Sequence, residues 1–497
     1  MNFPGLIFLI LAHFISGRGI LQLFKLQLKP VQMVCLSVVL GVPLVSLAPC
    51  FIQLMHIPIT FNSVFAGVAI VTLLCSIPLL IGFKRPSFGK IEWPGIYELP
   101  FLLVCLGLVV LSVWRCYYYP PTARDMLAGP ELLAEFAVRE KTMVSSVFTV
   151  DLHTTNNYFK SPYITCLQII YKLLATPPFG QTWMSILFIP FIIFMYSMLR
   201  ERIHPFLASL LLFLFLTIPD LFAYSFVMLY DYSNMVFFFL GFYFLLRHLE
   251  NRRTNDFAFS VFMFGLATYI RVETVILVGL VSLLPLFVFF REKQDIKTIA
   301  TRWAIMMAVP TAFYFICIDL FVRHFVPLPF NASNDINKNL GDVSYLFDRF
   351  KEINDKLIFG AQGKVVYGLF LYFFLGLLMI DIVIFLTNTK KQRFSKEAMY
   401  ALVGVTIIYV GLPILGYLLP LFDVMNTTKR GLFKLMPMIL LYMSNSRLLQ
   451  MISEWLKKLE SGKKDAPPQL RAPVAKVAPK PVGTVPANVK VKGKGKR

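Results

Sequence analysis

The chain has 497 residues, of which 57% are hydrophobic and only 15% are charged, and its mean hydropathy is +0.69. A soluble domain carries about a quarter charged residues, so this composition excludes an ordinary soluble globular protein. Apolar runs of about 17–25 residues recur along the chain and predict an all-α polytopic membrane protein.

The net charge of +21 does not indicate a nucleic-acid partner. Between Lys457 and Arg497, ten Lys and two Arg stand against Glu460 and Asp465. This Pro-, Ala-, Val- and Lys-rich tail cannot bury enough apolar surface to fold, so we expect it to be disordered and to lie against anionic lipid headgroups. Most other basic residues fall in short loops between apolar runs, where positive charge sets membrane topology.

The apolar runs predict about thirteen transmembrane helices. The run 257–290 is about twice the length of one span and is interrupted by Arg271 and Glu273, so we expect two helices that turn there. The expected spans are 3–24, 33–54, 63–83, 97–115, 183–199, 205–221, 233–247, 257–271, 273–290, 302–325, 366–387, 398–419 and 431–448.

Three segments follow from this pattern. Residues 1–96 form an N-terminal membrane segment of three helices, residues 97–448 form the main transmembrane module, and residues 449–497 form the basic tail. The N-terminus lacks a basic stretch before its apolar run, which predicts an uncleaved first span rather than a signal peptide.

Along this order of spans, every second loop is rich in Lys and Arg, so these loops lie on one side of the membrane. The basic tail falls on the same side, which is assigned to the cytoplasm. The sequence therefore predicts a multi-pass protein of the plasma, inner or endoplasmic reticulum membrane with a cytoplasmic C-terminus. The elaborate segments all fall on the extracytoplasmic side: 116–182, 222–232, 271–273, 326–365 and 420–430.

The segment 116–182 is the longest polar stretch between two spans and carries many ionisable groups. Asp125 follows its span by about ten residues, so it is expected close to the membrane surface. A carboxylate there can accept a proton from an acceptor hydroxyl, and Asp125 is the predicted general base. Its neighbour Arg124 can hold a phosphate, and the alternative is a surface Arg–Asp pair at a bend. Glu131 and His153 lie in the same loop as candidate substrate-positioning groups.

Within this loop, GPELLAEFAVREKTM predicts a short amphipathic helix with Leu132, Leu133, Phe136 and Ala137 on one stripe. The later stretch SPYITCLQIIYKLLA has a similar character. Such helices lie in the plane of the membrane interface and can frame a groove that is open to lipid.

Other ionisable residues are expected on the same face. Asp231 stands just before a span, and Arg271 with Glu273 marks the turn of the helix pair, either as a functional group or as a mutual ion pair. Lys429 and Arg430 stand at the mouth of the last span, against the usual distribution of positive charge. A lipid phosphate is their natural partner, and ordinary headgroup contact is the alternative.

Three short stretches, YYPPTARDMLAGPE, TYIRVETVIL and TKRGLFKLMPMILLY, resemble segments of the GT-C glycosyltransferases. This superfamily includes the protein O-mannosyltransferases, the aminoarabinose transferases of lipid A and the catalytic subunits of oligosaccharyltransferases. The resemblance covers residues 97–448 in layout. No WWD-type motif occurs in the chain, which argues against an oligosaccharyltransferase.

The resemblance implies an inverting transfer of a sugar from a polyprenyl phosphate to a hydroxyl of a lipid, glycan or protein acceptor. Asp125 is then the general base, and Lys429, Arg430 and Arg271 bind the donor phosphate. The substrate-positioning residues implied with them are Arg124, Glu131, Asp231, Glu273 and His153.

No cofactor or metal site is predicted. The seven cysteines show no CxxC or Cys/His spacing, and the loop around Asp231 reads DYSN rather than DxD. A divalent metal that Asp231 helps to position stays an open alternative.

Two other classes of function remain open. A transporter or flippase for a lipid-linked or anionic solute concentrates its polar groups near the membrane midplane, whereas here they gather at one face. A non-catalytic scaffold accounts for the tail but leaves Lys429 and Arg430 without a role.

Overall fold

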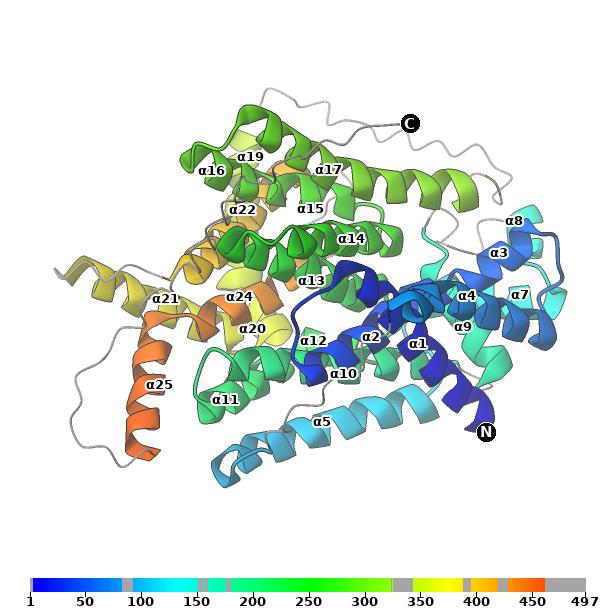
Figure 1. Cartoon of the computed structure of the whole chain (residues 1–497), viewed down its shortest axis with the longest axis horizontal. Helices are drawn as coiled ribbons and strands as arrows, with labels where there is room; N and C mark the ends of the chain where they lie inside the picture. Colours follow the sequence, from blue (N-terminus) through cyan, green and yellow to red (C-terminus); the bar gives the residue numbers. More distant parts are fainter. Residues whose placement is uncertain are drawn as a thin grey trace, which may run out of the picture. The chain divides into compact units, whose positions relative to one another are not determined.

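The architecture is described from a computed structural model of the chain. It describes residues 3–82, 93–150, 155, 160–175, 180–322, 324, 343–387, 395–418 and 428–460. All regular elements within these ranges are helices (Figure 1). In the first half they are α1 (Phe3–Phe24), α2 (Pro30–Val45), α3 (Ala48–Leu54), α4 (Phe61–Gly82), η1 (Ile96–Glu98), α5 (Leu99–Tyr118), α6 (Arg124–Met126), η2 (Leu127–Glu131), α7 (Leu132–Glu140), α8 (Ser146–Thr149), α9 (Tyr163–Leu174), α10 (Thr182–Arg200), α11 (Pro205–Leu216), α12 (Pro219–Tyr224) and α13 (Tyr230–Asn251).

The second half continues in the same way, with several short helices placed between long ones. These elements are α14 (Thr254–Ile270), α15 (Thr274–Val281), α16 (Leu283–Arg291), α17 (Ile296–Phe315), η4 (Ile316–Val322), α19 (Val343–Ile353), η5 (Asn354–Ile358), α20 (Ala361–Tyr367), α21 (Phe370–Thr387), α22 (Lys396–Leu418), α23 (Lys429–Phe433), α24 (Leu435–Ser444) and α25 (Arg447–Glu460).

Within the described ranges, eight helical segments are long and apolar enough to cross a membrane. The predicted all-α, membrane-embedded class is therefore confirmed at this level. The eight segments are Phe3–Phe24, Pro30–Leu54, Phe61–Ile81, Ile96–Tyr118, Thr182–Arg200, Thr274–Arg291, Phe370–Thr387 and Lys396–Tyr417.

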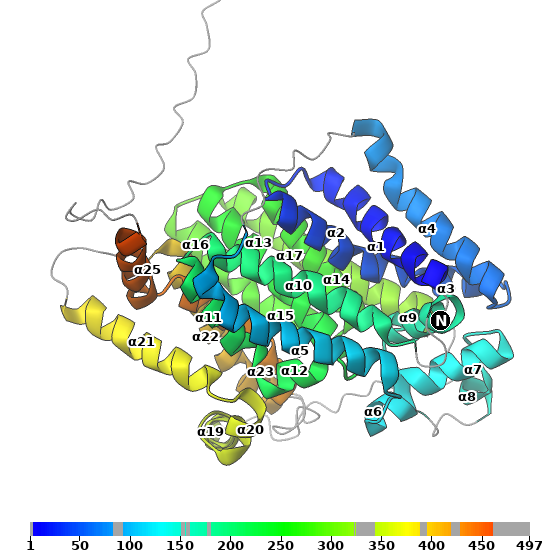
Figure 2. The ribbon, with the colours of Figure 1, turned by 90° about the horizontal axis from the view of Figure 1, so that it is seen from below.

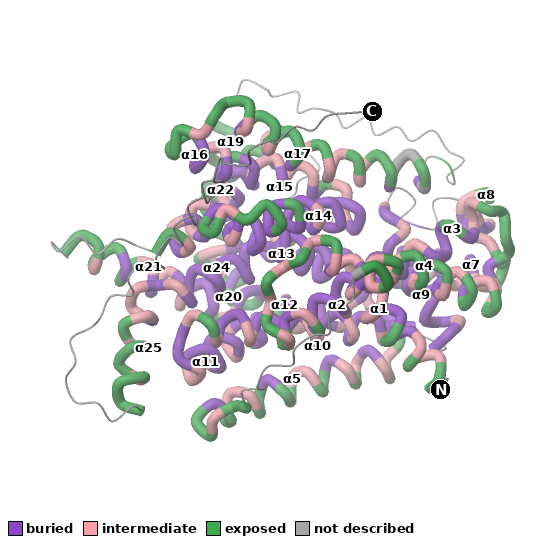
Figure 3. Tube along the Cα trace, viewed as in Figure 1, coloured by how far each residue is buried: buried purple, intermediate pink, exposed green. Residues whose placement is uncertain are grey.

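Burial divides the helices into an inner and an outer group (Figure 3). Nearly every residue of α13 and α14 is buried, and these two helices pack directly on each other. Helices α4, α5 and α21 instead present long rows of exposed Leu, Ile, Val and Phe side chains. So much exposed apolar surface is unfavourable in water, and lipid is the solvent in which these outer helices are stable.

Helices α1 and α2 approach each other closely because of two glycines. A Cβ atom added at Gly17 would lie 1.8 Å from the carbonyl oxygen of Ser37, and one at Gly41 would lie 1.9 Å from that of His13. Small residues of this kind let helix backbones come together in a membrane, where van der Waals packing replaces the hydrophobic effect.

The predicted turn at Arg271 and Glu273 is confirmed. Helix α14 ends at Ile270, Arg271 is extended with φ −145° and ψ 108°, and α15 begins at Thr274. Other expected spans are also divided: 33–54 breaks between α2 and α3, 205–221 between α11 and α12, 273–290 between α15 and α16, and 431–448 between α23 and α24.

The polar segment 116–182 contains the short helices α6, α7, α8 and α9. Figure 2 shows α6, α7 and α8 close together, beyond one end of α5. The predicted amphipathic helix is confirmed as α7. Helix α9 differs from the expectation of an interfacial helix, because almost all of its side chains are buried among the other helices rather than on one face.

Residues 1–454 form one compact unit. Residues 455–497 form a second unit, which consists of the end of α25 and of the tail beyond the described ranges. The prediction that residues 449–497 form a disordered tail is wrong for residues 449–460, because they belong to helix α25. Residues 461–497 lie outside the described ranges.

Candidate functional site

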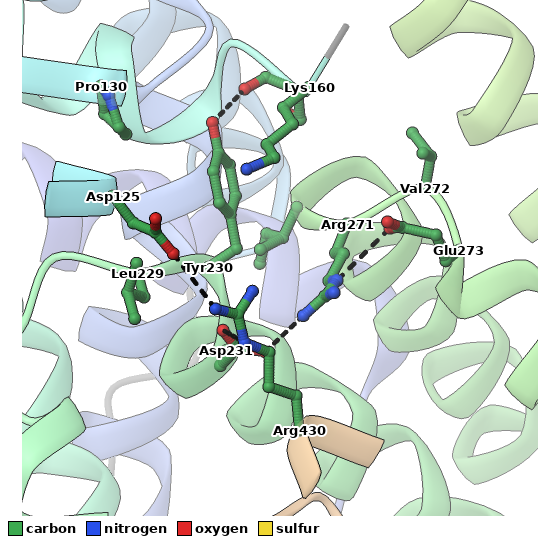
Figure 4. Close-up of a pocket in the computed structure, with 12 residues that line it drawn as sticks. Asp125, Pro130, Lys160, Leu229, Tyr230, Asp231, Arg271, Val272, Glu273 and Arg430 are labelled. Carbon is green, nitrogen blue, oxygen red and sulfur yellow. Dashed lines mark hydrogen bonds and ion pairs between the residues drawn. The ribbon is translucent and has the colours of Figure 1, made fainter. Parts of the chain in front are cut away.

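Five distant stretches of the chain line one pocket, and four of them supply a carboxylate or a guanidinium (Figure 4). Asp125 comes from α6, Asp231 from the first turn of α13, Arg271 from the break between α14 and α15, and Arg430 from α23. Each of these residues begins or ends a helix, because the long apolar helices place their polar residues at their termini. The complete lining is Asp125, Pro130, Lys160, Ser161, Leu229, Tyr230, Asp231, Ile270, Arg271, Val272, Glu273 and Arg430.

Asp231 is the buried centre of this site. Its side chain is only 2% exposed and forms an ion pair with Arg271, while Arg430 Nε lies 3.7 Å from its Oδ2. Burial alone would raise the pKa of Asp231, but the charges of Arg271 and Arg430 outweigh it and hold the pKa below its ordinary value. The carboxylate is therefore ionised, and it holds two guanidinium groups in place.

The break between α14 and α15 positions Arg271. Arg271 Nε donates to Glu273 at 3.3 Å on one side, while its Nη1 reaches Asp231 on the other. Asn234, one helical turn beyond Asp231, stabilises the break: its amide nitrogen donates to the carbonyl of Ala267 and to the hydroxyl of Thr274, both at 2.7 Å. These bonds tie α13 to both sides of the break, in addition to the bond that the Ala267 carbonyl accepts from the backbone N–H of Arg271 at 3.0 Å.

Asp125 faces Arg430 across the pocket. Arg430 Nη2 lies 3.2 Å from Asp125 Oδ2, and the Asp125 side chain is 44% exposed. Arg430 thus lies between an accessible carboxylate and the buried carboxylate of Asp231 (Figure 4). Because the contact of Arg430 with Asp125 is single and partly solvated, it is easier to exchange for another anion than the contacts of Asp231.

Lys429 starts α23 beside Arg430 but points to a different carboxylate. Its Nζ lies 3.1 Å from Oδ2 of Asp220, in α12. Lys434, one turn further along, is buried and donates to the carbonyl of Arg430 at 3.4 Å. Lys429 therefore places a further cation, and Lys434 a buried amine, next to the pocket, and neither is among its lining residues.

Lys160 adds a cation from the loop of residues 116–182. Its side chain points into the pocket in Figure 4. Burial lowers its pKa, and the nearby charges of Arg271 and Arg430 lower it further. The hydroxyl of Tyr230 donates to the carbonyl of Ser161 at 2.8 Å, which ties this part of the loop to the start of α13.

Three of the candidate positioning residues are not among the lining residues. Arg124 is exposed beside Asp125, and His153 lies outside the described residues. Glu131 is paired with the buried Lys172 at 2.5 Å and accepts from Gln168 at 2.7 Å. These contacts of Glu131 hold the segment 116–182 against α9.

Sequence reasoning overlooked four residues that build the site: Lys160, Asp220, Tyr230 and Asn234. Tyr230 directly precedes Asp231 at the start of a long apolar helix, and Asn234 follows Asp231 at helical spacing, on the same helix face. This spacing of polar residues was a signal in the sequence that could have identified both of them. Lys160 and Asp220 carry no such local signal, since only the fold brings them to the pocket.

The pocket has a volume of about 50 Å³, which is room for a few water molecules. A sugar phosphate can enter only when side chains that line the pocket move apart. Within the described part of the chain, no group of three or more His, Cys, Asp or Glu side chains is arranged to hold a metal ion.

Comparisons of the chain with protein-family models, with curated proteins and with solved structures find no match.

Proposed function

We propose that the protein is an integral membrane glycosyltransferase of the GT-C type. It spans the membrane about thirteen times, with the pocket of Asp125 at the extracytoplasmic face and the basic tail in the cytoplasm. It moves a sugar from a polyprenyl-phosphate donor to a hydroxyl of a lipid, glycan or protein acceptor, with inversion at the anomeric carbon. Residues 97–448 carry the reaction, and residues 1–96 pack onto them as an N-terminal helix group.

One observation carries this proposal. Three of the residues expected to act together, Asp125, Arg271 and Arg430, line the same pocket although they are far apart in the chain. The pocket combines an accessible carboxylate with convergent guanidinium groups, and it lies at the ends of apolar helices. This combination suits a reaction that needs a base and an anion site next to lipid.

The arginines are the donor-phosphate site in this mechanism. Guanidinium groups bind phosphate oxygens through paired, charge-assisted hydrogen bonds. Asp231 is too buried to contact an acceptor, and it positions Arg271 and Arg430 by pairing with both. Lys429, held by Asp220 at 3.1 Å, adds positive potential on the same side of the phosphate.

Donor binding also releases the base. Arg430 contacts Asp125 in the empty pocket, and a donor phosphate competes for the same guanidinium. When the phosphate takes Arg430, the carboxylate of Asp125 becomes free to accept a proton. This exchange also widens the pocket, whose volume of about 50 Å³ is otherwise too small for a sugar.

The chemical step is then a single displacement. The oxygen of the acceptor hydroxyl forms a bond to the anomeric carbon while its proton passes to Asp125. The bond between the anomeric carbon and the phosphate oxygen breaks, and polyprenyl phosphate leaves with the electron pair. Arg430 and Arg271 stabilise the negative charge that grows on the phosphate.

The test is the turnover of a panel of polyprenyl-phosphate sugars by the purified full chain, wild type against Asp125→Asn. Loss of a general base lowers kcat by about 10²–10⁴-fold. We expect sugar transfer or donor hydrolysis in the wild type and a loss of this size in the variant, with the elution profile unchanged. Donor binding should be retained or strengthened, because the phosphate no longer competes with the Asp125 carboxylate for Arg430. Glu140→Gln is the matched control, because Glu140 is an exposed carboxylate of the same loop that bonds only within that loop.

Three results contradict the proposal in different ways. Unchanged turnover in Asp125→Asn moves the base to another residue. A wild type that binds the donor but never turns it over favours transport of a lipid-linked solute. A wild type that binds no polyprenyl phosphate removes the glycosyltransferase assignment altogether.

A further inference from the structure

A second polar feature lies away from the Asp125 pocket, where α19 and η5 pack along the C-terminal half of α22. The rings of Tyr345 and Tyr417 are 6.2 Å apart, and those of Phe350 and Tyr409 are 5.5 Å apart. The hydroxyl of Tyr409 bonds to Oδ1 of Asn354 at 2.5 Å. Helix α19 therefore runs antiparallel to α22, and its start lies at the end of α22.

Arg349 lies inside this contact. It is only 8% exposed, and its Nε and Nη2 have no hydrogen-bond partner within the described ranges. A buried guanidinium without an acceptor is strongly unfavourable, so a native structure normally supplies an anion to such a group.

The neighbouring residue on α22 makes room for this guanidinium. A Cβ atom added at Gly416 would lie 2.3 Å from Nε and 2.9 Å from Nη2 of Arg349. A side chain at position 416 would therefore displace the guanidinium from its place against α22.

An apolar pocket lies further along α22, and Asn354 of η5 and Tyr409 of α22 are among its lining residues. It has a volume of about 230 Å³ and lies between α21, α22, α24 and η5. Leu371, Phe374 and Leu402 are among the apolar side chains that line it. Tyr409 and Asn354 supply polar groups to its wall, and Gly416 stands two helical turns from Tyr409, about 10 Å along α22.

We propose that Arg349 and this apolar pocket together bind an anionic glycerophospholipid. The guanidinium holds the phosphodiester, and an acyl chain occupies the pocket. In a phospholipid, a long acyl chain extends away from the phosphate. The site has the same layout, because the cation lies about 10 Å along a spanning helix from an apolar cavity.

Charge selects the type of lipid. Arg349 forms no ion pair within the described ranges, and a lipid with a net charge of −1 neutralises it, whereas a zwitterionic headgroup brings its own ammonium close to the guanidinium. Arg349 and Gly416 do not line the Asp125 pocket, so the inference does not depend on glycosyl transfer.

Binding of phosphatidylglycerol to the purified, delipidated full chain in detergent tests the inference, with native mass spectrometry as the readout. We expect Arg349→Leu to weaken binding about tenfold or more, since a charge-assisted hydrogen bond is lost. Gly416→Ala should weaken binding similarly while it keeps the arginine, and Arg349→Lys should lie between the wild type and Arg349→Leu. Arg139→Leu is the control, because Arg139 is a well-exposed arginine on α7.

Thermal unfolding supplies a second readout that a merely structural arginine would not give. Without lipid, Arg349→Leu removes an unpaired buried charge, so its Tm should equal or exceed that of the wild type. The rise in Tm on adding phosphatidylglycerol should disappear in this variant.

Several outcomes overturn the inference. These are equal affinity of Arg349→Leu and wild type for phosphatidylglycerol, equal affinity of the wild type for phosphatidylcholine, and a large drop in the lipid-free Tm of Arg349→Leu. If a polyprenyl phosphate displaces phosphatidylglycerol and its binding depends on Arg349, the pocket is assigned to the isoprenoid chain instead.

Discussion

Arg430 Nη2 lies 3.2 Å from Oδ2 of Asp125, although 305 residues separate the two in the chain. The same guanidinium reaches Asp231 through Nε at 3.7 Å. Arg430 is therefore shared between an accessible carboxylate and a buried one. In the proposed mechanism, this sharing couples the arrival of a phosphate to the release of Asp125.

Substitution of Arg430 tests the shared contact. Arg430→Leu should weaken donor binding about 10–100-fold, because charge-assisted hydrogen bonds to the phosphate are lost. Arg430→Lys should retain part of the affinity, since the ammonium attracts phosphate but lacks the planar fork that forms paired hydrogen bonds to it. Equilibrium binding of a labelled polyprenyl phosphate measures both effects.

Arg252→Leu is the control for this experiment. Arg252 is also partly exposed and also forms an ion pair, with Glu292, but neither residue lines the pocket. Equal donor binding in Arg430→Leu and Arg252→Leu would exclude Arg430 from the phosphate site.

Removal of the buried carboxylate has a different signature. Asp231→Asn leaves Arg271 and Arg430 close together without their shared anion, and breaking a buried pair in this way costs about 3–5 kcal/mol. We expect a clear fall in the Tm of the detergent-solubilised protein at pH 7, together with lower activity.

The pH dependence of the Tm identifies the charge of Asp231 as the cause of this loss of stability. Its pKa is below the ordinary value in the folded state, so its contribution to stability is complete above the unfolded pKa, which is about 3.9, and is lost as the pH falls through the folded value. The Tm difference between wild type and Asp231→Asn should stay constant from about pH 7 to about pH 5 and shrink only below about pH 4. A difference that shrinks already between pH 7 and pH 5 would point to another titrating group.

The sequence predicted the class of fold and much of the pocket for a simple physical reason. In a membrane chain, ionisable residues stand out against apolar runs, and Arg271, Glu273 and Arg430 were visible at the ends of such runs. The break at Arg271 followed from length alone, because one span cannot take up the run 257–290.

The remaining features depend on tertiary contacts that no local pattern reports. Glu131 has the same loop context as Asp125, yet it turns to Lys172 on α9. Helix α9 reads as a surface amphipathic helix but is covered on its other faces by neighbouring helices. Asp220 is separated from Lys429 by 209 residues of sequence, and their 3.1 Å contact requires α12 and α23 to meet.

Lys172 is predicted to be essential for the stability of the loop that carries Asp125. Its side chain is 7% exposed and pairs with Glu131 at 2.5 Å and Glu135 at 3.0 Å. The hydrogen bond from Lys172 lowers the pKa of Glu135 against the opposing effect of burial. Lys172→Met strands the largely buried Glu131 and should cost about 3 kcal/mol of unfolding free energy.

Two further variants show whether this loss arises from the ion pair. The double variant Lys172→Met/Glu131→Gln should be more stable than Lys172→Met alone, because it no longer contains the stranded carboxylate. Arg139→Met, which removes a well-exposed partner of Glu135, should change the unfolding free energy by less than about 1 kcal/mol. A double variant that is no better than the single one would mean that packing of the lysine stem dominates.

Asn234 is predicted to act on the reaction through Arg271. Its amide nitrogen donates to Ala267 and Thr274 at 2.7 Å and so keeps the helix open at the residue that carries the guanidinium. Asn234→Leu should destabilise the protein by about 1–3 kcal/mol, since it removes two buried hydrogen bonds, to the carbonyl of Ala267 and to the hydroxyl of Thr274. It should also raise the donor KM more than it lowers kcat, because Arg271 shifts while Asp125 stays in place. Asn234→Asp tests the same position with a group that cannot donate when ionised, and it should weaken donor binding as well. A variant whose Tm falls while its donor KM stays at the wild-type value would show that Asn234 only packs the helices and does not position Arg271.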